Sequence, residues 1–162
     1  MEISVVIPVY YSEKILPELC RQLEDALLNF EYEVILVNDG SQDNSWDVIS
    51  NICNENQKIC GICLLRNFGQ DNAIMAGLSY SVGEYTVIMD DDLQHSPYDI
   101  QNLLDQCKDG FDVCFANYED KKEQKWWKNF GSYINTNTCF VKSNRKVIKS
   151  WSTMAILNGV II

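Results

Sequence analysis

Short apolar runs alternate with segments of helical periodicity over most of this 162-residue chain. Ile3–Ile7 is a continuous apolar run that ends at Pro8, as expected of a buried parallel strand. Between Ile15 and Phe30 the leucines recur at helical spacing, which predicts a helix that packs on the sheet. Further strands are expected at Glu33–Val37, Ile59–Leu65, Tyr85–Met89 and Phe111–Ala116. A second helix is expected to begin at about Ser45. A third is expected to run from a cap at Asp71 or Asn72 to about Ser81, and a fourth to span Pro97–Cys107. The alternation predicts a Rossmann-like α/β fold, an open and mainly parallel sheet flanked by helices.

The length fits a single domain, and no linker or repeat divides the chain. Residues 1–120 form the predicted core. Over residues 121–162 the pattern weakens to one helix and a short strand near Cys139–Val141, within the same domain. With 46% apolar and 22% charged residues, the composition is that of a soluble globular protein. No run is long enough to span a membrane and no basic leader precedes the first strand, so a cytoplasmic location is expected.

The two parts of the chain carry opposite charge. Residues 1–120 hold 22 acidic and 5 basic side chains, whereas residues 121–162 hold one acidic and 8 basic side chains. The acidic part argues against nucleic acid as a partner, because phosphate backbones are bound by basic faces. Around Trp126 and Trp127 lysines and aromatic residues are mixed, as in proteins that bind the surface of a membrane. A helix that packs both tryptophans on the core explains the same pattern, and both interpretations stay open.

The seven cysteines are scattered through the predicted helices and strands. Cys60 and Cys63 alone have the C-x-x-C spacing of a metal site, and no second pair accompanies them. His95, the single histidine, is far away in the sequence. Reduced and mostly buried thiols are therefore expected rather than a zinc site.

Three consecutive carboxylates, Asp90, Asp91 and Asp92, follow the apolar run Tyr85–Met89. Side chains alternate in direction along an extended chain, so Asp90 and Asp92 are expected to converge while Asp91 points away. Two neighbouring carboxylates repel each other unless a cation compensates them. Mg²⁺ or Mn²⁺ suits such oxygen ligands and shares its coordination with phosphates. A solvated acidic turn or a helix N-cap is the alternative.

Other polar residues follow the predicted strands, at the sheet edge where open α/β folds bind ligands. The first strand leads to Tyr10 and Glu13, and the second leads to Asp39. The glycine-rich fingerprints of dehydrogenases and P-loop NTPases are absent. A nucleotide could still bind here, with Tyr10 beside its base, Asp39 accepting a hydrogen bond from base or ribose, and its diphosphate over the metal. Asp39 alone is weak support, because Asp-Gly-Ser is also an ordinary turn.

Five motifs together resemble the family-2 glycosyltransferases of GT-A fold. They are Ile-Pro-Val-Tyr at 7–10, Val-Asn-Asp-Gly-Ser at 37–41, Arg-Asn-Phe-Gly-Gln at 66–70, Ala-Ile-Met-Ala-Gly-Leu at 73–78 and Met-Asp-Asp-Asp-Leu-Gln-His at 89–95. Their order and spacing match the family over roughly residues 3–120. The chain is most similar to the polyprenyl-phosphate sugar transferases, a group that includes dolichol-phosphate mannose synthase.

The resemblance implies a role for individual residues. The positions that form the nucleotide pocket in the family correspond here to Pro8, Tyr10, Glu13 and Asp39. Asp90 and Asp92 match the D-x-D motif, which in the family binds the metal and takes part in catalysis. The resemblance also implies that Asp90 contacts the nucleotide. Arg66 and Gln70 lie in a loop beside the donor. Gly69 and Gly77 are expected to serve backbone shape and close helix packing.

The implied reaction moves a sugar from a nucleoside diphosphate sugar to a polyprenyl phosphate or a cell-surface glycan, with inversion. The divalent metal neutralises charge on the leaving diphosphate. A hydroxyl acceptor needs a general base, whereas an acceptor phosphate is already nucleophilic. His95 is a candidate base, although its Leu-Gln-His-Ser-Pro context is also typical of a strand-to-helix corner.

Beyond residue 120 the likeness thins. Segments 128–135 and 140–148 resemble the acceptor side of the family, but the stretch Thr136–Cys139 between them is shorter than in the family. Some relatives carry a carboxylate base in this segment, and this chain has Thr138 and Cys139 at the corresponding positions. The acceptor region is therefore expected to be abridged, and three functions stay open. They are a glycosyltransferase at the cytoplasmic membrane face, a truncated or degenerate domain that binds nucleotide sugar without turnover, and a nucleotidyltransferase. A nucleotidyltransferase would normally carry a basic, glycine-rich loop after the first strand. Monomer and homodimer are both compatible with the sequence.

Overall fold

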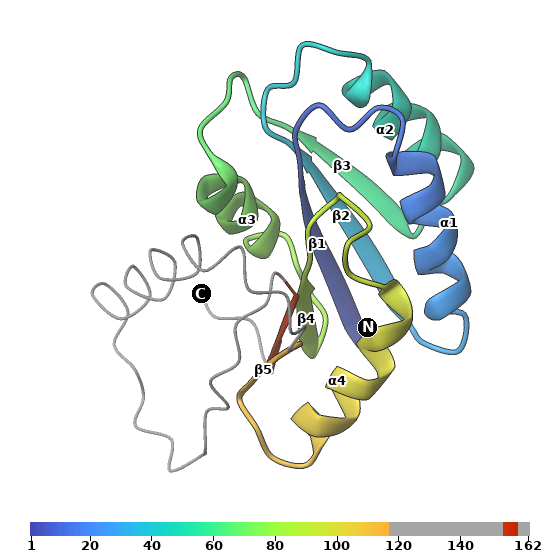
Figure 1. The fold of residues 1–162 in the computed structure, drawn as a ribbon, viewed down its shortest axis with the longest axis vertical. Helices are drawn as coiled ribbons and strands as arrows, with labels where there is room; N and C mark the ends of the chain where they lie inside the picture. Colours follow the sequence, from blue (N-terminus) through green and yellow to red (C-terminus); the bar gives the residue numbers. More distant parts are fainter. Residues whose placement is uncertain (117–153, 159–162) are drawn as a thin grey trace.

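A mixed six-stranded sheet forms the centre of the computed structural model, which describes residues 1–116 and 154–158 (Figure 1). The strands are β1 (Ile3–Val9), β2 (Tyr32–Asn38), β3 (Ile59–Cys63), β4 (Tyr85–Ile88), β5 (Val113–Phe115) and β6 (Ala155–Asn158). They are ordered β3-β2-β1-β4-β6-β5, and β3, β2, β1 and β4 pair in parallel. Among the strands of residues 1–116 and 154–158, only β6 runs against its neighbours, so the predicted open and mainly parallel sheet is confirmed.

The helices begin and end close to the predicted positions. They are α1 (Leu16–Ala26), α2 (Ser45–Glu55), α3 (Gln70–Leu78), the 3₁₀ turn η1 (Pro97–Asp99) and α4 (Ile100–Lys108). The predicted cap of α3 is wrong, because this helix starts at Gln70 and its N-cap is Gly69, with φ of 93° and no capping side chain. A left-handed backbone at Gly69 turns the chain into the helix without a side-chain acceptor.

Strand β6 is not expected from the sequence pattern. Ile156 pairs with Val87 of β4 and with Cys114 of β5, so β6 lies between two strands that are distant from it in sequence. The sequence of β6 is Ala-Ile-Leu-Asn, and the alanine and asparagine at its ends have a low intrinsic preference for a strand. Pairing with β4 and β5 therefore stabilises the strand. The strand expected near Cys139–Val141 and the helix expected after Lys121 lie outside the described residues.

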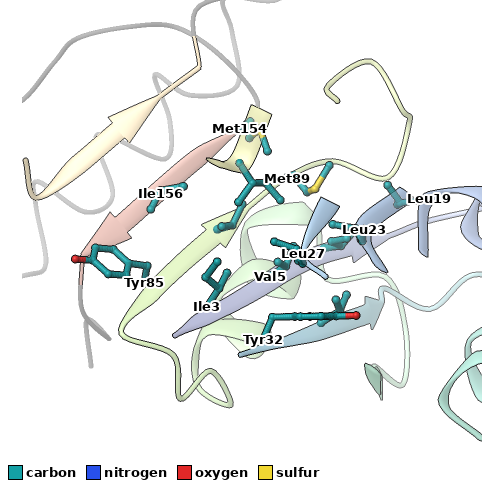
Figure 2. Packing of buried hydrophobic residues seen from close by; sticks show 14 of the residues in the cluster. Ile3, Val5, Leu19, Leu23, Leu27, Tyr32, Tyr85, Met89, Met154 and Ile156 are labelled. Carbon is teal, nitrogen blue, oxygen red and sulfur yellow. The ribbon is translucent and has the colours of Figure 1, made fainter. Parts of the chain in front are cut away.

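Alternating side chains of the central strands pack on opposite faces of the sheet. One face of the sheet, with Ile3 and Val5 of β1, lies under helices α1, α2 and α4. Figure 2 shows Leu19 and Leu23 of α1, and Leu27 just after it, close to β1. Met154 and Ile156 join the same core from the C-terminal segment (Figure 2).

Helix α3 covers the opposite face of the sheet (Figure 1). It lies close to the strands because Gly77 has no side chain: a Cβ there would be 2.4 Å from Val6 Cγ1 and 3.1 Å from Val37 Cγ2. The expectation of close helix packing at Gly77 is confirmed. This approach fixes the start of α3, and with it Gln70, at the carboxyl end of β1.

The expectation of mostly buried thiols holds for only part of the described cysteines. Cys20, Cys107 and Cys114 are buried, whereas Cys60 and Cys63 are exposed on β3, an edge strand, and all are free thiols. Burial raises the pKa of the Cys20 thiol to about 12, so this group stays protonated at neutral pH. Among the described helices, none is long and apolar enough to cross a membrane.

Candidate functional site

A pocket of about 290 Å³ opens at the carboxyl edge of the sheet. Its walls come from the ends of β1, β2 and β4 and from the loop between β3 and α3. The lining residues are Pro8, Val9, Tyr10, Asp39, Asn67, Gly69, Gln70, Asp90, Asp91 and Asp92. Parallel strands direct their carboxyl ends to one edge, so segments far apart in sequence meet there. The predicted ligand-binding edge therefore carries a hollow with four aspartates in its wall.

The three consecutive aspartates lie beyond the end of β4. Strand β4 ends at Ile88, and Leu93 has φ of 59°, so the chain turns instead of continuing as a strand. All three aspartates line the pocket, and the carboxylate of Asp91 is directed at the loop after β1. The carboxylate of Asp90 is directed instead at Gln70 on α3, so Asp91 and Asp90 have partners in different segments. Convergence of Asp90 and Asp92 on a metal stays a prediction.

Asp91 is partly buried beneath the loop after β1. Its Oδ2 accepts a hydrogen bond from the Tyr10 N–H at 3.3 Å and a second, short one from the Ser12 hydroxyl. Burial raises the pKa of Asp91 above its ordinary value, while the hydrogen bonds from Ser12 and Tyr10 act in the opposite direction. The net direction is upward, so removal from water outweighs the two donors.

Asp90 and Asp92 have different partners. Asp90 Oδ1 accepts a hydrogen bond from Gln70 Nε2 at 2.7 Å, which ties the end of β4 to the first residue of α3. Asp92 is exposed, and its Oδ1 accepts the Gln94 N–H at 3.0 Å within its own turn. The triplet is thus connected to three separate parts of the pocket wall: the loop after β1, the start of α3 and the turn after β4.

The donor set at the pocket suits a hard divalent cation. Carboxylate oxygens have two lone pairs each, so hydrogen-bonded oxygens of Asp90 and Asp92 keep capacity for a metal. Within residues 1–116 and 154–158, no group of three or more acidic, histidine or cysteine side chains forms a complete metal site. A cation held by two carboxylates would complete its shell with water and phosphate oxygens, which is the usual arrangement for Mg²⁺. The residues fit a metal that binds together with a phosphorylated ligand.

Asp39 holds the loop that forms the opposite wall. It is only 3% exposed, and its two oxygens accept the N–H groups of Phe68 at 2.7 Å and Gly69 at 2.9 Å. Gly40 lets this loop come close, because a Cβ at Gly40 would be 2.4 Å from the Arg66 carbonyl carbon. Asp39 therefore faces the pocket as predicted and also shapes its wall.

Six of the predicted site residues meet in the pocket: Pro8, Tyr10, Asp39, Gln70, Asp90 and Asp92. Two others lie outside its lining. Glu13 accepts hydrogen bonds from the backbone and side-chain nitrogens of Asn44 at the start of α2, at 2.9 and 3.0 Å. The Arg66 guanidinium lies 4.8 Å from the centre of the Phe68 ring. Contact of Glu13 or Arg66 with a nucleotide stays a prediction.

Four wall residues are not predicted as site residues from the sequence: Val9, Asn67, Gly69 and Asp91. Asn67 lies inside one of the five family motifs, so its position was available as a signal. Asp91 is set aside by the periodicity argument. His95, the candidate base, is partly buried and does not line the pocket.

Comparison with known proteins decides the family. The model of Glycosyl transferase family 2 matches residues 4–158, nearly the whole chain. The chain belongs to glycosyltransferase family 2. The resemblance to polyprenyl-phosphate sugar transferases is also supported by a relative from Enterobacter sp. (strain 638), an undecaprenyl-phosphate 4-deoxy-4-formamido-L-arabinose transferase. The two are 40% identical over 136 residues, which cover 82% of this chain and 41% of the relative. This family-2 chain therefore spans less than half the length of that relative.

Solved structures confirm the GT-A fold of this family-2 chain. Residues 1–349 of S. aureus TarS superpose with a TM-score of 0.67 at 20% identity, and the match covers 98% of this chain and 47% of that fragment. The same TarS fragment is known in complex with UDP. The mannosyltransferase PcManGT from Pyrobaculum calidifontis, solved with GDP-Man and Mn²⁺, superposes with a TM-score of 0.68 at 13% identity. The match covers 97% of this chain and 44% of the PcManGT chain. At these identities the likeness concerns the fold.

Proposed function

We propose that this chain forms the donor site of a metal-dependent glycosyltransferase that moves a sugar from a nucleoside diphosphate sugar to a polyprenyl phosphate. One observation supports it above all: Tyr10, Asp39 and the pair Asp90 and Asp92 follow the ends of three different strands and line a single pocket. An aromatic ring, a buried acceptor and two carboxylates are the groups that a base, a ribose and a metal-bound diphosphate would need. The relative from Enterobacter supports a polyprenyl phosphate over a cell-surface glycan as the acceptor.

Each residue has a separate part in this proposal. Tyr10 is 49% exposed and offers its ring to the base. Asp39 holds the loop at Phe68 and Gly69 and keeps lone pairs for a base or ribose donor. Asp90 and Asp92 would hold Mg²⁺ or Mn²⁺. When bound, the cation supplies Lewis-acid stabilisation of the charge that develops on the diphosphate.

The proposed transfer to an acceptor phosphate needs no general base from the protein. An oxygen of the acceptor phosphate forms a bond to the anomeric carbon as the bond from that carbon to the diphosphate breaks, and the nucleoside diphosphate leaves with the electron pair. A phosphate oxygen is already anionic at neutral pH, so no proton has to be removed. This fits a pocket whose wall lacks His95. Attack from the face opposite the leaving group gives inversion, as in the family that the chain resembles.

One departure from the family pattern favours a second candidate function. Thr138 and Cys139 stand where some kin carry a carboxylate base, so transfer to a hydroxyl acceptor would lack that base. A domain that binds nucleotide sugar without transferring it agrees with this departure. Transfer and binding alone make different predictions for turnover.

Release of nucleoside diphosphate separates the two functions. The protein is incubated with UDP-, GDP- and dTDP-sugars, Mn²⁺ and short-chain polyprenyl phosphate, and released nucleotide and glycolipid are measured. The proposal predicts release that requires both the acceptor and the metal. Binding of a nucleotide sugar without acceptor-dependent release would favour the binding domain, and failure to bind any of them would contradict both functions.

The lipid acceptor implies contact with a membrane surface on its cytoplasmic face. We propose that the lysine- and tryptophan-containing segment 121–130 contributes to it, because cations and indole rings suit the headgroup region. Replacing both Trp126 and Trp127 by Ser should lower cosedimentation with liposomes that contain anionic lipid. Tyr80→Ser, which removes an aromatic side chain that is 65% exposed just after α3, is the control. Equal cosedimentation of the double variant and the unchanged protein would contradict the membrane role.

A further inference from the structure

Four successive backbone amides after β1, those of residues 10–13, each donate a hydrogen bond to a side chain of another segment. The Tyr11 N–H donates to Ser41 Oγ at 3.1 Å, the Ser12 N–H to Ser45 Oγ at 2.9 Å, and the Glu13 N–H to Asp43 at 3.4 Å. These three acceptors belong to the segment that leads from β2 into α2. The fourth amide, that of Tyr10, donates to Asp91 after β4. The loop is therefore fixed from two sides of the pocket.

The backbone of this loop needs such support. Tyr11 has φ of 58°, in the left-handed region that residues other than glycine seldom adopt. A conformation of this kind persists only where surrounding contacts determine it, and it is commonly found at ligand sites. The rings of Tyr10 and Tyr11 meet edge to face with centroids 4.6 Å apart, so the loop's conformation also sets the direction of the Tyr10 ring.

Asp91 makes two contacts with this loop through one oxygen. Its Oδ2 accepts both the Tyr10 N–H and the Ser12 hydroxyl. Ser12 is itself buried, and its backbone N–H donates to Ser45 Oγ, so the contact links Asp91 through Ser12 to the start of α2. Asp90 and Asp92, on either side of Asp91, are bound to Gln70 and to the Gln94 amide. Asp91 thus joins the aromatic wall of the pocket to the two candidate metal ligands.

From this geometry we propose that Asp91 is a positioning residue that fixes Tyr10 relative to Asp90 and Asp92. The assignment rests on the proposed function, in which Tyr10 meets the base and the two aspartates meet the metal-bound diphosphate. One ligand spans both walls, so a fixed spacing lets the metal and the nucleotide strengthen each other's binding. Such coupling is reciprocal and is measured as the factor by which one ligand raises affinity for the other.

Two variants of equal charge separate positioning from electrostatics. Asp91→Ala and Asp91→Asn both remove one negative charge beside the metal site. Asn keeps an oxygen that can accept from Tyr10 and Ser12, whereas Ala keeps none. Ser12→Ala is the third variant, since it removes one donor and leaves every carboxylate in place. Calorimetry with UDP and GDP, each with and without Mn²⁺, gives the coupling factor for every protein, and thermal unfolding reports whether each variant folds.

The positioning role predicts that Asp91→Ala lowers the coupling factor about tenfold, the size expected for losing charge-assisted hydrogen bonds. Asp91→Asn should restore most of it, and Ser12→Ala should lower it by a smaller factor. A purely structural role would instead lower affinity equally with and without metal. If Asp91→Ala does not fold, the Ser12→Ala variant decides.

Three results would overturn the assignment. Equal coupling factors for Asp91→Ala and Asp91→Asn, both below that of the unchanged protein, would point to charge alone. A coupling factor unchanged in Asp91→Ala, or in Ser12→Ala where the former does not fold, would show that the tether has no such effect. In both cases the proposed function survives, because the unchanged protein still binds nucleotide more tightly with Mn²⁺. If the unchanged protein shows no metal-dependent binding, the proposed function fails and the assignment fails with it.

Discussion

Asp92→Asn is expected to weaken Mn²⁺-dependent binding of a nucleoside diphosphate by about a hundredfold or more, at the upper end of effects seen around metal sites. The substitution keeps the shape of the side chain and an oxygen that can accept the Gln94 N–H. It removes one of the two charges proposed to hold the cation, and an amide oxygen is a poorer ligand for a hard metal. Because Asp92 is exposed, the free energy of unfolding should change by less than about 0.5 kcal/mol.

Calorimetry with and without Mn²⁺ measures the first effect, and urea unfolding measures the second. Asp105→Asn on α4 is a matched control, since it makes the same chemical change at an exposed position outside the pocket lining. Asp105→Asn should bind as the unchanged protein does. Equal affinity of Asp92→Asn and Asp105→Asn in the presence of Mn²⁺ would contradict the proposed metal site.

Gly40→Ala is expected to destabilise the fold by about 2–4 kcal/mol, since overpacking and a left-handed backbone each cost about 1–3 kcal/mol. Gly40 has φ of 67°, and a Cβ there would lie 2.4 Å from the Arg66 carbonyl carbon and 2.5 Å from the Asn67 nitrogen. These are backbone atoms, which cannot rotate away as a side-chain end could. Moving them would also disturb the hydrogen bonds from Phe68 and Gly69 to Asp39.

Gly110→Ala is the control for this prediction. Gly110 has φ of 108°, so it shares the cost of a left-handed backbone, but a Cβ added there would meet nothing within 4 Å. Its variant should lose about 1 kcal/mol, and urea unfolding of both variants gives the difference. Equal destabilisation of the two variants would show that the loop after β3 does not press against Gly40.

Most of the sheet could be predicted from local sequence. Strands β1 to β4 are apolar runs bounded by turns, and each pattern is contained within a few residues. Strand β6 could not be predicted in this way, because Ala155–Asn158 owes its strand to pairing with β4 and β5 from distant parts of the chain. Long-range pairing leaves no periodic signal in a four-residue segment.

The site was predictable in its location and less so in its hydrogen bonding. Motifs at strand ends placed Tyr10, Asp39 and Asp90 at one edge, because parallel strands end together. The direction of Asp91 depends on β4 ending at Ile88, one residue before the predicted end, and on the turn at Leu93. Strand ends and turn geometry are set by tertiary contacts, so residue spacing alone could not supply them.

Anomalous diffraction from crystals soaked with Mn²⁺ and UDP or GDP tests the central claim most directly. The account predicts a manganese peak in the pocket, with carboxylate oxygens of Asp90 and Asp92 on one side and diphosphate oxygens on the other. A nucleotide bound elsewhere, or a nucleotide in this pocket with no manganese at these two carboxylates, would contradict it.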